Sequence, residues 1–265
     1  MKLPTAARSS TCFAAAACLA LLSPPARADD AAVTDGRWRG NLGAALSATS
    51  GNTSSSALLL SADAARLTDA DKISLSGNIN YAHAKIDGVR TTTADKMNVV
   101  GQYDRNIDTR LFGFGKLAFD HDRVNHLTLR SALDGGLGYK LVDTKPLHFT
   151  VFAGGGYASD RYDSPQTVGN RTDTRFSRTS VLLAEESAHE LTPTVTAKQR
   201  LEWNAGISGD KAHLLKFTAG LGVAMSSTMS LTVGLIDTYN NRPPTGQQSN
   251  DVSLLTGLNV KFDGS

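Results

Sequence analysis

The chain is poor in the residues that mark several protein classes. Its only cysteines are Cys12 and Cys18, so the remainder of the 265 residues can form no disulfide and no cysteine-bound metal site. No stretch after residue 28 approaches the ~18 to 20 consecutive apolar residues of a membrane-spanning helix. Charged residues make up 20% but form no long run of one sign, and apolar residues recur throughout, which argues against a disordered chain.

An export signal is predicted for residues 1–28. Its parts are a basic start (Lys2 and Arg8), an apolar run (11–22) and a small–x–small cleavage site (26–28). The apolar run is too short for a spanning anchor. The leucine usual ahead of a lipoprotein cysteine is missing before Cys18. We therefore expect residues 29–265 to form the exported domain.

The net charge gives no support for nucleic acid as a partner. Removing Lys2, Arg8 and Arg27 with the signal leaves 24 of the 27 basic residues against 25 acidic ones. Affinity for nucleic acid depends on a basic surface that neutralises phosphates, and this balance does not supply one.

Alternation of apolar and polar residues dominates the mature chain. Residues 72–82 place Ile73, Leu75 and Ile79 on one face and serines and asparagines on the other. This period of two indicates strands with chemically different faces. Twelve such segments are predicted, with boundaries uncertain by roughly two to four residues: 36–49, 54–66, 72–85, 93–106, 110–122, 128–141, 147–160, 175–189, 194–206, 212–225, 229–240 and 250–263.

These segments predict an all-β fold, a closed antiparallel transmembrane β-barrel. Each segment exceeds the mean globular strand of ~5 to 6 residues and reaches the ~9 to 11 residues that a tilted strand needs to cross a bilayer. An even number suits a bacterial barrel whose two ends lie on one side. The count falls to ten if segments 54–66 and 175–189 are misassigned.

The connections differ between the two predicted rims. Those after even-numbered segments are tight, and those after odd-numbered segments include two long ones, residues 161–174 and 241–249. Short periplasmic turns and longer outer loops are typical of outer-membrane barrels. A soluble β-sandwich has no reason to segregate its loops in this way.

Aromatic residues are predicted to form two girdles at the rims of the apolar face. Amphipathic rings are best placed at headgroup depth, whereas the aromatics of a sandwich core would lie mid-strand. The girdle residues are Trp38, Tyr103, Phe112, Tyr139, Phe149 and Phe262 near the periplasmic rim, and Tyr81, Tyr157, Trp203 and Tyr239 near the opposite rim.

The polar face is expected to line the lumen. Its charged residues include Arg130, Asp134, Lys198, Arg200, Glu202 and Lys216. Buried charge is costly unless it is hydrated or paired, so such a lumen must be wet or crossed by ion pairs. Two interpretations stay open. The cluster from Lys198 to Lys216 selects anions in a narrow pore, or it is an internal charge ladder that stabilises the barrel.

Residues suited to catalysis or metal binding are sparse. Residues 120–122 with His126 have metal-binding side chains, yet they fall at a strand end and in a loop, where solvated charges are common. Ser187 and His189 share a strand face, but the sequence shows no acid or oxyanion donor to complete a triad. Glycines 154–156 lack the lysine of a phosphate loop. We expect no enzyme activity, no cofactor and no metal.

Several motifs resemble the YdiY-like family, described as salt-induced outer membrane proteins of unknown function. They are Trp38-Arg39-Gly40, Gly51-Asn52-Thr53, Leu191-Thr192-Pro193-Thr194, the loop 239–244 (YNNRPP) and the ending 251–262 (DVSLLTGLNVKF). The resemblance covers residues 36–262, and the ending is its most specific part. It implies an outer membrane barrel and supplies no catalytic or ligand residues. The chain departs from the common pattern because Phe262 is not its last residue.

The expected protein is an outer membrane barrel of a Gram-negative bacterium, acting as a narrow passive channel or an envelope-stress barrel. Its expected partners are outer membrane lipids, the barrel insertion machinery and small ions or solutes. One alternative is a structural or adhesive barrel that acts through its outer loops with a closed lumen. Another is a membrane-embedded hydrolase using Ser187 or His189. The channel is favoured by the polar lumen and by the lack of a segment long enough to form a plug.

Overall fold

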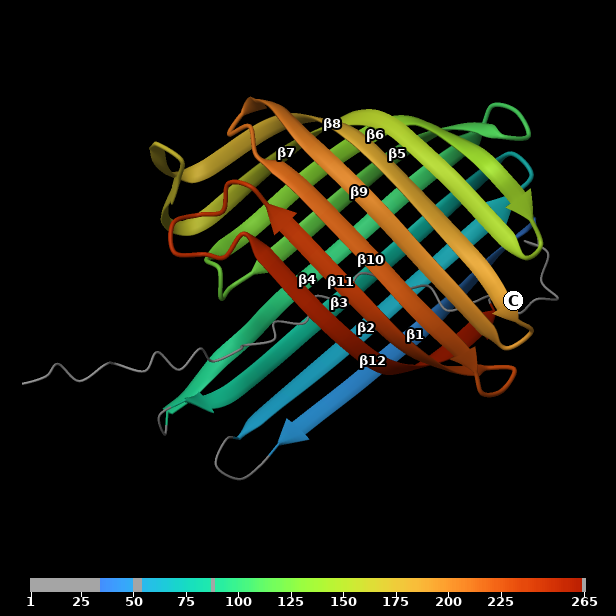
Figure 1. The fold of residues 1–265 in the computed structure, drawn as a ribbon, viewed down its shortest axis with the longest axis horizontal. Coiled ribbons are helices and arrows are strands. Elements are labelled where there is room, and N and C mark those ends of the chain that lie inside the picture. The colour runs from blue at the N-terminus through green and yellow to red at the C-terminus, as the bar shows by residue number, and fades with distance from the viewer. Residues whose placement is uncertain (1–33, 50–53, 87–88, 264–265) are drawn as a thin grey trace, which may run out of the picture.

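Strands occupy nearly all of the chain that the structure describes. The computed structural model describes residues 34–49, 54–86 and 89–263, so the predicted export signal lies outside the described residues. Within these ranges the strands form the barrel drawn in Figure 1. They are β1 (Asp35–Thr49), β2 (Ser55–Thr68), β3 (Asp71–Ile86), β4 (Val89–Asn106), β5 (Leu111–Asp122), β6 (Leu127–Thr144), β7 (Leu147–Val168), β8 (Arg171–Thr192), β9 (Val195–Gly209), β10 (His213–Ala224), β11 (Met229–Asn240) and β12 (Asn250–Asp263).

The strands close into one antiparallel ring. Each strand pairs with its neighbours in sequence, and β1 pairs with β12 from Arg39↔Asp263 to Ala44↔Leu258. This pairing joins the first strand to the last, and a closed sheet is the form in which strands can meet lipid. The prediction of a closed barrel with twelve strands is confirmed, because β2 and β8 cover the two doubtful segments. In the described residues, no helix is long and apolar enough to cross a membrane.

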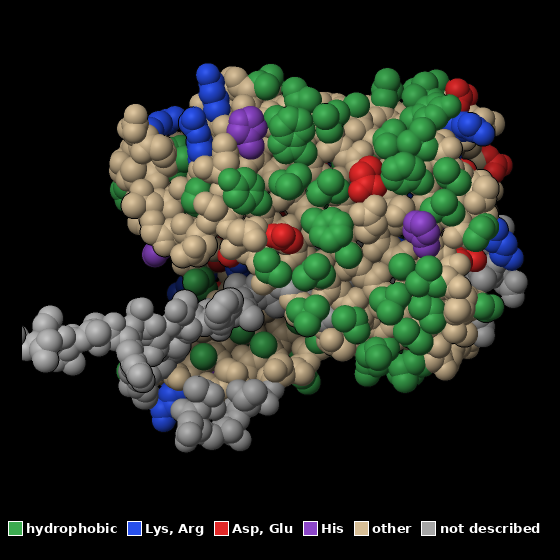
Figure 2. Space-filling view, in the orientation of Figure 1, with side chains coloured by type: hydrophobic (Ala, Val, Ile, Leu, Met, Phe, Trp, Pro, Cys, Tyr) green, Lys and Arg blue, Asp and Glu red, His purple; other side chains and the backbone are tan. Residues whose placement is uncertain are grey.

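Side chains alternate between an apolar outer wall and a polar lumen, as the period of two predicts. On β3, Leu75, Ile79 and Tyr81 are exposed on the outside, whereas Asn78 and Asn80 between them face inward and are buried. Large apolar side chains are exposed on every strand. In Figure 2 they spread over the visible outer wall, while the lysine and arginine side chains lie toward its two ends.

The predicted long loop at residues 161–174 is wrong. β7 continues to Val168, β8 begins at Arg171, and a turn with Gly169 at φ +59° joins them. The pairs Gln166↔Asp173 and Thr167↔Thr172 extend the ladder beyond a bulge. Polar residues lie on both faces of this hairpin, so alternation offers no chemical contrast to detect. The predicted loop at 241–249 remains a connection without strand structure.

Four short turns at the opposite rim share one hydrogen-bond pattern. In each, a side-chain oxygen accepts bonds from the backbone N–H groups two and three residues on, at 2.7–3.3 Å. This local pattern favours a turn over continued strand. The accepting residues are Thr68, Asp108, Thr192 and Ser226. In the second turn, the bonds from Leu111 and Arg110 lower the pKa of the exposed Asp108 because they stabilise its carboxylate.

The structure places most of the predicted girdle aromatics on the outer wall. Phe149 is partly exposed. The exposed ones are Trp38, Tyr81, Tyr103, Tyr139, Tyr157, Trp203, Tyr239 and Phe262. The placement of Phe112 is wrong, because its ring is only 6% exposed and faces the lumen. Leu117 and Phe119 occupy the outward positions of β5, so the even-numbered residues, including Phe112, point inward.

Candidate functional site in the barrel lumen

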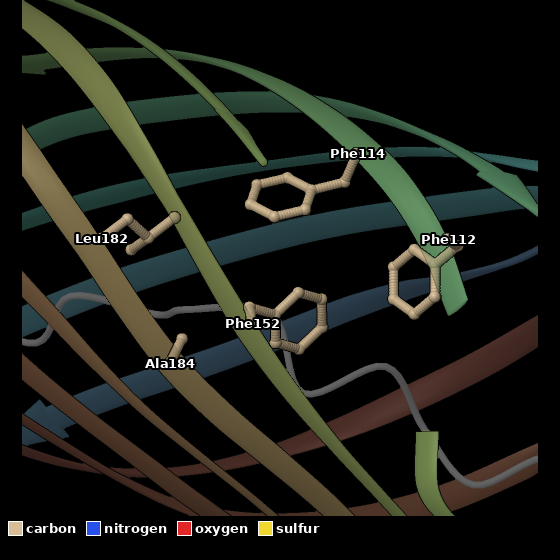
Figure 3. Close-up of a cluster of buried hydrophobic side chains, with 5 residues drawn as sticks. All are labelled: Phe112, Phe114, Phe152, Leu182 and Ala184. Atoms are coloured by element: carbon tan, nitrogen blue, oxygen red, sulfur yellow. The ribbon is translucent and has the colours of Figure 1, made fainter. Parts of the chain in front are cut away.

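One wall of the lumen, on β5, β7 and β8, is filled by apolar side chains. Figure 3 shows Phe112, Phe114, Phe152, Leu182 and Ala184 pointing toward one another from these strands. The Phe152 ring makes edge-to-face contacts with Phe112 and Phe114, with ring centroids 5.7 and 5.6 Å apart. Such contacts add to the stabilisation from apolar burial. Gly138 on β6 makes room for the cluster, because a Cβ there would overlap the Phe112 ring.

Lys116 forms ion pairs inside the lumen, on the same strand as Phe112 and Phe114. Lys116 on β5 lies 3.0 Å from Asp134 on β6 and 3.2 Å from Glu202 on β9, measured from its Nζ to the carboxylate oxygens. β5 and β9 are not neighbours in the ring, so the bond to Glu202 spans part of the interior. Both partners are largely buried, which strengthens the attraction relative to water.

Arg200 on β9 extends the same network. Its guanidinium lies 2.7 Å from Glu186 and 3.0 Å from Glu202, and its Cζ sits 4.8 Å from the centroid of the Phe152 ring. Asn204 donates a further bond of 2.9 Å to Glu202. The structure therefore brings together Asp134, Arg200 and Glu202 of the predicted lumen residues, and it ties their charges to one another.

A second network lies toward the rim that carries the β7–β8 hairpin. Arg130 donates two bonds of 2.7 Å to Asp160, whose second oxygen also accepts from Arg178 at 3.2 Å. Arg178 lies 3.3 Å from Asp210 in the β9–β10 connection. Arg130 is thus held apart from the Arg200 network. The sequence analysis missed Arg178 and Lys116, although alternation from exposed neighbours on β8 and β5 indicates that both face inward.

Small side chains recur on the lumen wall from β10 through β12 and β1 to β2, although Ile236 on β11 and Leu59 on β2 also face inward and are buried. On β10 and β11, Gly220 pairs directly with Gly234, and the outward neighbours Leu221 and Val233 show that both glycines face inward. A Cβ on Gly43 of β1 would meet the side chains of Ser61 and Asn259 across the strands. By the same alternation, the inward positions of this wall include Gly43, Ser61, Thr218, Gly220, Gly222, Thr232, Gly234 and Gly257.

Lysines are spaced around this small-residue wall. Lys216 on β10 stands opposite Glu202 in the register, and Lys198 on β9 stands opposite Gly220. Lys72 on β3 pairs with Asp104, and Lys261 on β12 pairs with Asn41 of β1. The sequence analysis named the first two of these lysines. It did not single out Lys72 or Lys261 as lumen charges.

The other sequence candidates lie apart from these lumen groups. Asp122 forms an ion pair of 3.0 Å with Lys96, and His126 bonds Asp163 at the rim. Among the described residues, no group of three His, Asp or Glu side chains is arranged to hold a metal. Ser187 and His189 lie on β8 at the parity of the outward Leu183, and in the described part of the chain no hydrogen bond joins them.

Comparison with known proteins identifies the family. A family model described as a protein of unknown function, DUF481, matches residues 42–262. The chain belongs to the DUF481 family. This DUF481 assignment agrees with the YdiY-like resemblance of the sequence motifs. No curated protein matches the DUF481 chain.

Solved structures similar to the DUF481 chain are barrels of low sequence identity. The NanC porin is 11% identical, with 86% of this chain and 99% of that chain covered and a TM-score of 0.47. An outer membrane channel from Pseudomonas putida F1 is also 11% identical, with 88% and 96% covered and a TM-score of 0.46. The translocator domain of the autotransporter NalP from Neisseria meningitidis is 7% identical, with 89% and 90% covered and a TM-score of 0.45.

Proposed function

We propose that this protein lies in the outer membrane of a Gram-negative bacterium and passes small ions or hydrophilic solutes through a narrow path. The path follows the small-residue wall formed by β10, β11, β12, β1 and β2. The observation that carries this proposal is the pairing of inward glycines, serines and threonines on adjacent strands, because these side chains reach the least into the lumen. No catalytic role for Ser187 or His189 is part of the proposal.

The outer wall supports the membrane location. Every strand exposes large apolar side chains, and Leu133 on β6 and Leu254 on β12 are 56% and 73% exposed. A continuous apolar surface of this kind is unfavourable in water and is covered in lipid. Outer membrane lipids and the barrel insertion machinery are the partners that this location requires.

The strand number supports a narrow path. Barrels of about eight strands are filled by side chains, and barrels of ~16 to 18 strands leave a broad aqueous channel. A ring of twelve strands lies between these limits. The Phe112 cluster and the Lys116–Glu202 ion pair occupy one side of this interior, which confines passage to the other.

Single-channel recording tests the proposal. The protein is purified from the envelope of an expressing Gram-negative host and added to a planar bilayer under a salt gradient. We expect discrete current steps of small amplitude with a defined reversal potential. A silent bilayer would overturn the proposal, provided that heat-dependent gel migration shows a folded barrel and protease protection shows insertion.

The resemblance to salt-induced proteins adds a physiological hypothesis. We propose that the amount of this protein in the envelope rises when external salt rises, as an envelope-stress role requires. Immunoblots of outer membrane fractions from the native host at low and high sodium chloride test this point. Equal amounts in both media would contradict it and would leave the channel proposal to the bilayer experiment.

A further inference from the structure

We infer that Arg161 and Arg175 form a binding site for the phosphate groups of a phosphorylated lipid in the outer leaflet of the membrane. Arg161 lies on β7 and Arg175 on β8, and the register places them directly opposite each other. The hairpin that carries them lies at the left end of the barrel in Figure 1. This site rests on the proposed membrane location and does not depend on conduction.

Both arginines lie on the outer wall of the barrel. Their neighbours Tyr162 and Phe176 are buried and pack together on the inner side of the hairpin. Alternation therefore directs the two arginines outward, where both are exposed. The residue opposite Arg161 on β6 is Leu129, which is 38% exposed, so the site adjoins the apolar surface that lipid covers.

The pair lies just beyond the outer aromatic girdle. Arg161 follows the exposed Tyr157 by four residues on β7. Four residues span ~13 Å along a strand, and a strand tilt of ~35–45° reduces this to roughly 10 Å along the membrane normal. Amphipathic rings mark the headgroup boundary, and arginine side chains are long and flexible. The guanidinium groups therefore reach the layer of lipid phosphates.

The acids next to the pair have other partners. Asp163, two residues further along β7, lies 3.0 Å from the Nδ1 atom of His126. Asp173, two residues before the arginine on β8, lies 2.6 Å from the guanidinium of Arg171. Within the part of the chain that the structure describes, no carboxylate forms an ion pair with either arginine of the site.

Two opposed guanidinium groups suit a phosphate. Residues directly opposite each other on antiparallel strands have Cβ atoms ~4.5–5.5 Å apart, and like charges at such positions are destabilising. Each guanidinium has a permanent charge and donates two parallel hydrogen bonds to a phosphate. A phosphate between the two groups therefore replaces repulsion with attraction on both sides.

A second opposed basic pair lies on the β3–β4 hairpin at the same rim. Lys85 follows the exposed Tyr81 by four residues and stands opposite Arg90 in the register. Both basic residues are exposed, and Arg90 also contacts the ring of His83. Two hairpins thus place positive charge four residues beyond a girdle tyrosine, at the same depth in the membrane.

Basic residues at the opposite rim include ones that acids of the same rim neutralise. Arg39 lies 2.7 Å from Asp35, and Arg105 lies 3.9 Å from Asp71. The opposed basic pairs are at the outer rim, so the lipid that they meet belongs to the outer leaflet.

Titration of the detergent-purified barrel with lipid A, a phosphorylated glycolipid, tests the site, with native mass spectrometry to measure binding. Dephosphorylated lipid A is the matched probe. Arg161→Gln with Arg175→Gln removes the site, and Arg105→Gln with Arg110→Gln removes the same charge at the opposite rim. We expect the site variant to bind lipid A about 25-fold more weakly than wild type, roughly fivefold for each arginine. The control variant should match wild type.

Three results of this titration would overturn the inference. The first is equal affinity of wild type for lipid A and its dephosphorylated form. The second is equal affinity of wild type and the site variant for lipid A. The third is competition by inorganic phosphate as effective as that by lipid A, which would assign the pair to a free anion.

Heat-dependent gel migration gives a second measurement in which the two states differ in sign. In neutral detergent the site variant should unfold at a slightly higher temperature than wild type, because repulsion between the arginines is relieved. With lipid A the order should reverse, because bound lipid stabilises wild type more. A variant that unfolds earlier in both conditions would show that the arginines stabilise the fold and would refute the lipid site.

These measurements separate the lipid site from the channel proposal. A silent planar bilayer together with arginine-dependent binding of lipid A would refute the channel and keep the site. Conductance without a preference for phosphorylated lipid would keep the channel and refute the site.

Discussion

The two sides of the lumen are built on opposite principles. On β5 to β9, bulky rings and ion pairs cross from strand to strand and fill the interior. On β10, β11, β12 and β1, glycine, serine and threonine recur at the inward positions and pair across the strands, so fewer bulky side chains reach into the lumen there. The comparison shows that two sides of one barrel can have different roles. Packed rings and ion pairs stabilise one side, and small side chains leave room for passage on the other.

The largest effect is expected from Phe152→Ala on the filled side. The substitution removes contacts to two phenylalanine rings and to the Arg200 guanidinium, and it leaves a cavity in a buried cluster. We expect a loss of about 3–5 kcal/mol in the free energy of unfolding. Urea titration of the barrel in lipid vesicles measures it.

Phe119→Ala is the matched control, because this ring lies on β5 at an outward, exposed position. It is expected to cost much less. Equal losses for the two variants would show that the Phe112 cluster does not stabilise the filled side.

Glu202→Gln is expected to have the second largest effect. The change leaves Lys116 and Arg200 with fewer compensating charges. We expect a loss of about 2 kcal/mol, below the ~3–5 of a fully buried broken pair, because the side chains of Lys116 and Glu202 keep 13% and 16% of their exposure. Glu185→Gln, on the outer wall beside Gln199, is the comparison and should cost less. A cost equal to that of Glu185→Gln would contradict a cross-lumen role for Glu202.

Gly220→Phe tests the small-residue side. The new ring enters the lumen beside Gly234 and obstructs the proposed path. We expect single-channel conductance to fall by about half or more while the barrel stays folded. Gly115→Phe is the control, because a Cβ at Gly115 meets no atom within 4 Å and points outward. Undiminished conductance in folded Gly220→Phe would place the path elsewhere.

The smallest effect is expected at the rim, from Asp108→Ala. Hydrogen bonds from Leu111 and Arg110 lower the pKa of Asp108 in the folded state, so its carboxylate stabilises the turn above the unfolded pKa of ~3.9. That stabilisation disappears as pH falls through the lowered pKa. The difference between wild type and variant should therefore be present at neutral pH and shrink in strong acid.

Ser226→Ala removes the same turn pattern without a titratable group. Its effect on stability should not change with pH. A pH-independent effect of Asp108→Ala would contradict the role given to its carboxylate.

Sequence alone predicted the wall better than the interior. The strands could be predicted because each has one face toward lipid and the other toward the lumen. This difference produces the alternation of apolar and polar residues in the sequence. Phe112 was misplaced because Leu111 and Phe112 put apolar residues at both parities, which removes the contrast. The hairpin ends of β7 and β8 were taken as loop for the same reason, since both faces there are polar.

The sequence could not predict which lumen charges form ion pairs with one another, and the reason is different. Lys116 and Glu202 are 86 residues apart, and nothing local links them. Their pairing depends on barrel diameter and strand tilt, which only the closed ring sets. The lumen residues themselves were predictable from alternation, whereas which of them neutralise one another was not.

The seam between β1 and β12 has a consequence for how the molecule is made. Every other strand pairing joins sequence neighbours and can form as the chain is delivered, hairpin by hairpin. The seam instead joins Gly43 to Asn259, so it cannot form until nearly the last residue is available. Bringing the ends of so long a chain together carries an entropic cost that local hairpins avoid. Closure is therefore the committing step of assembly, and a chain cut short before β12 would have two open edges and no barrel.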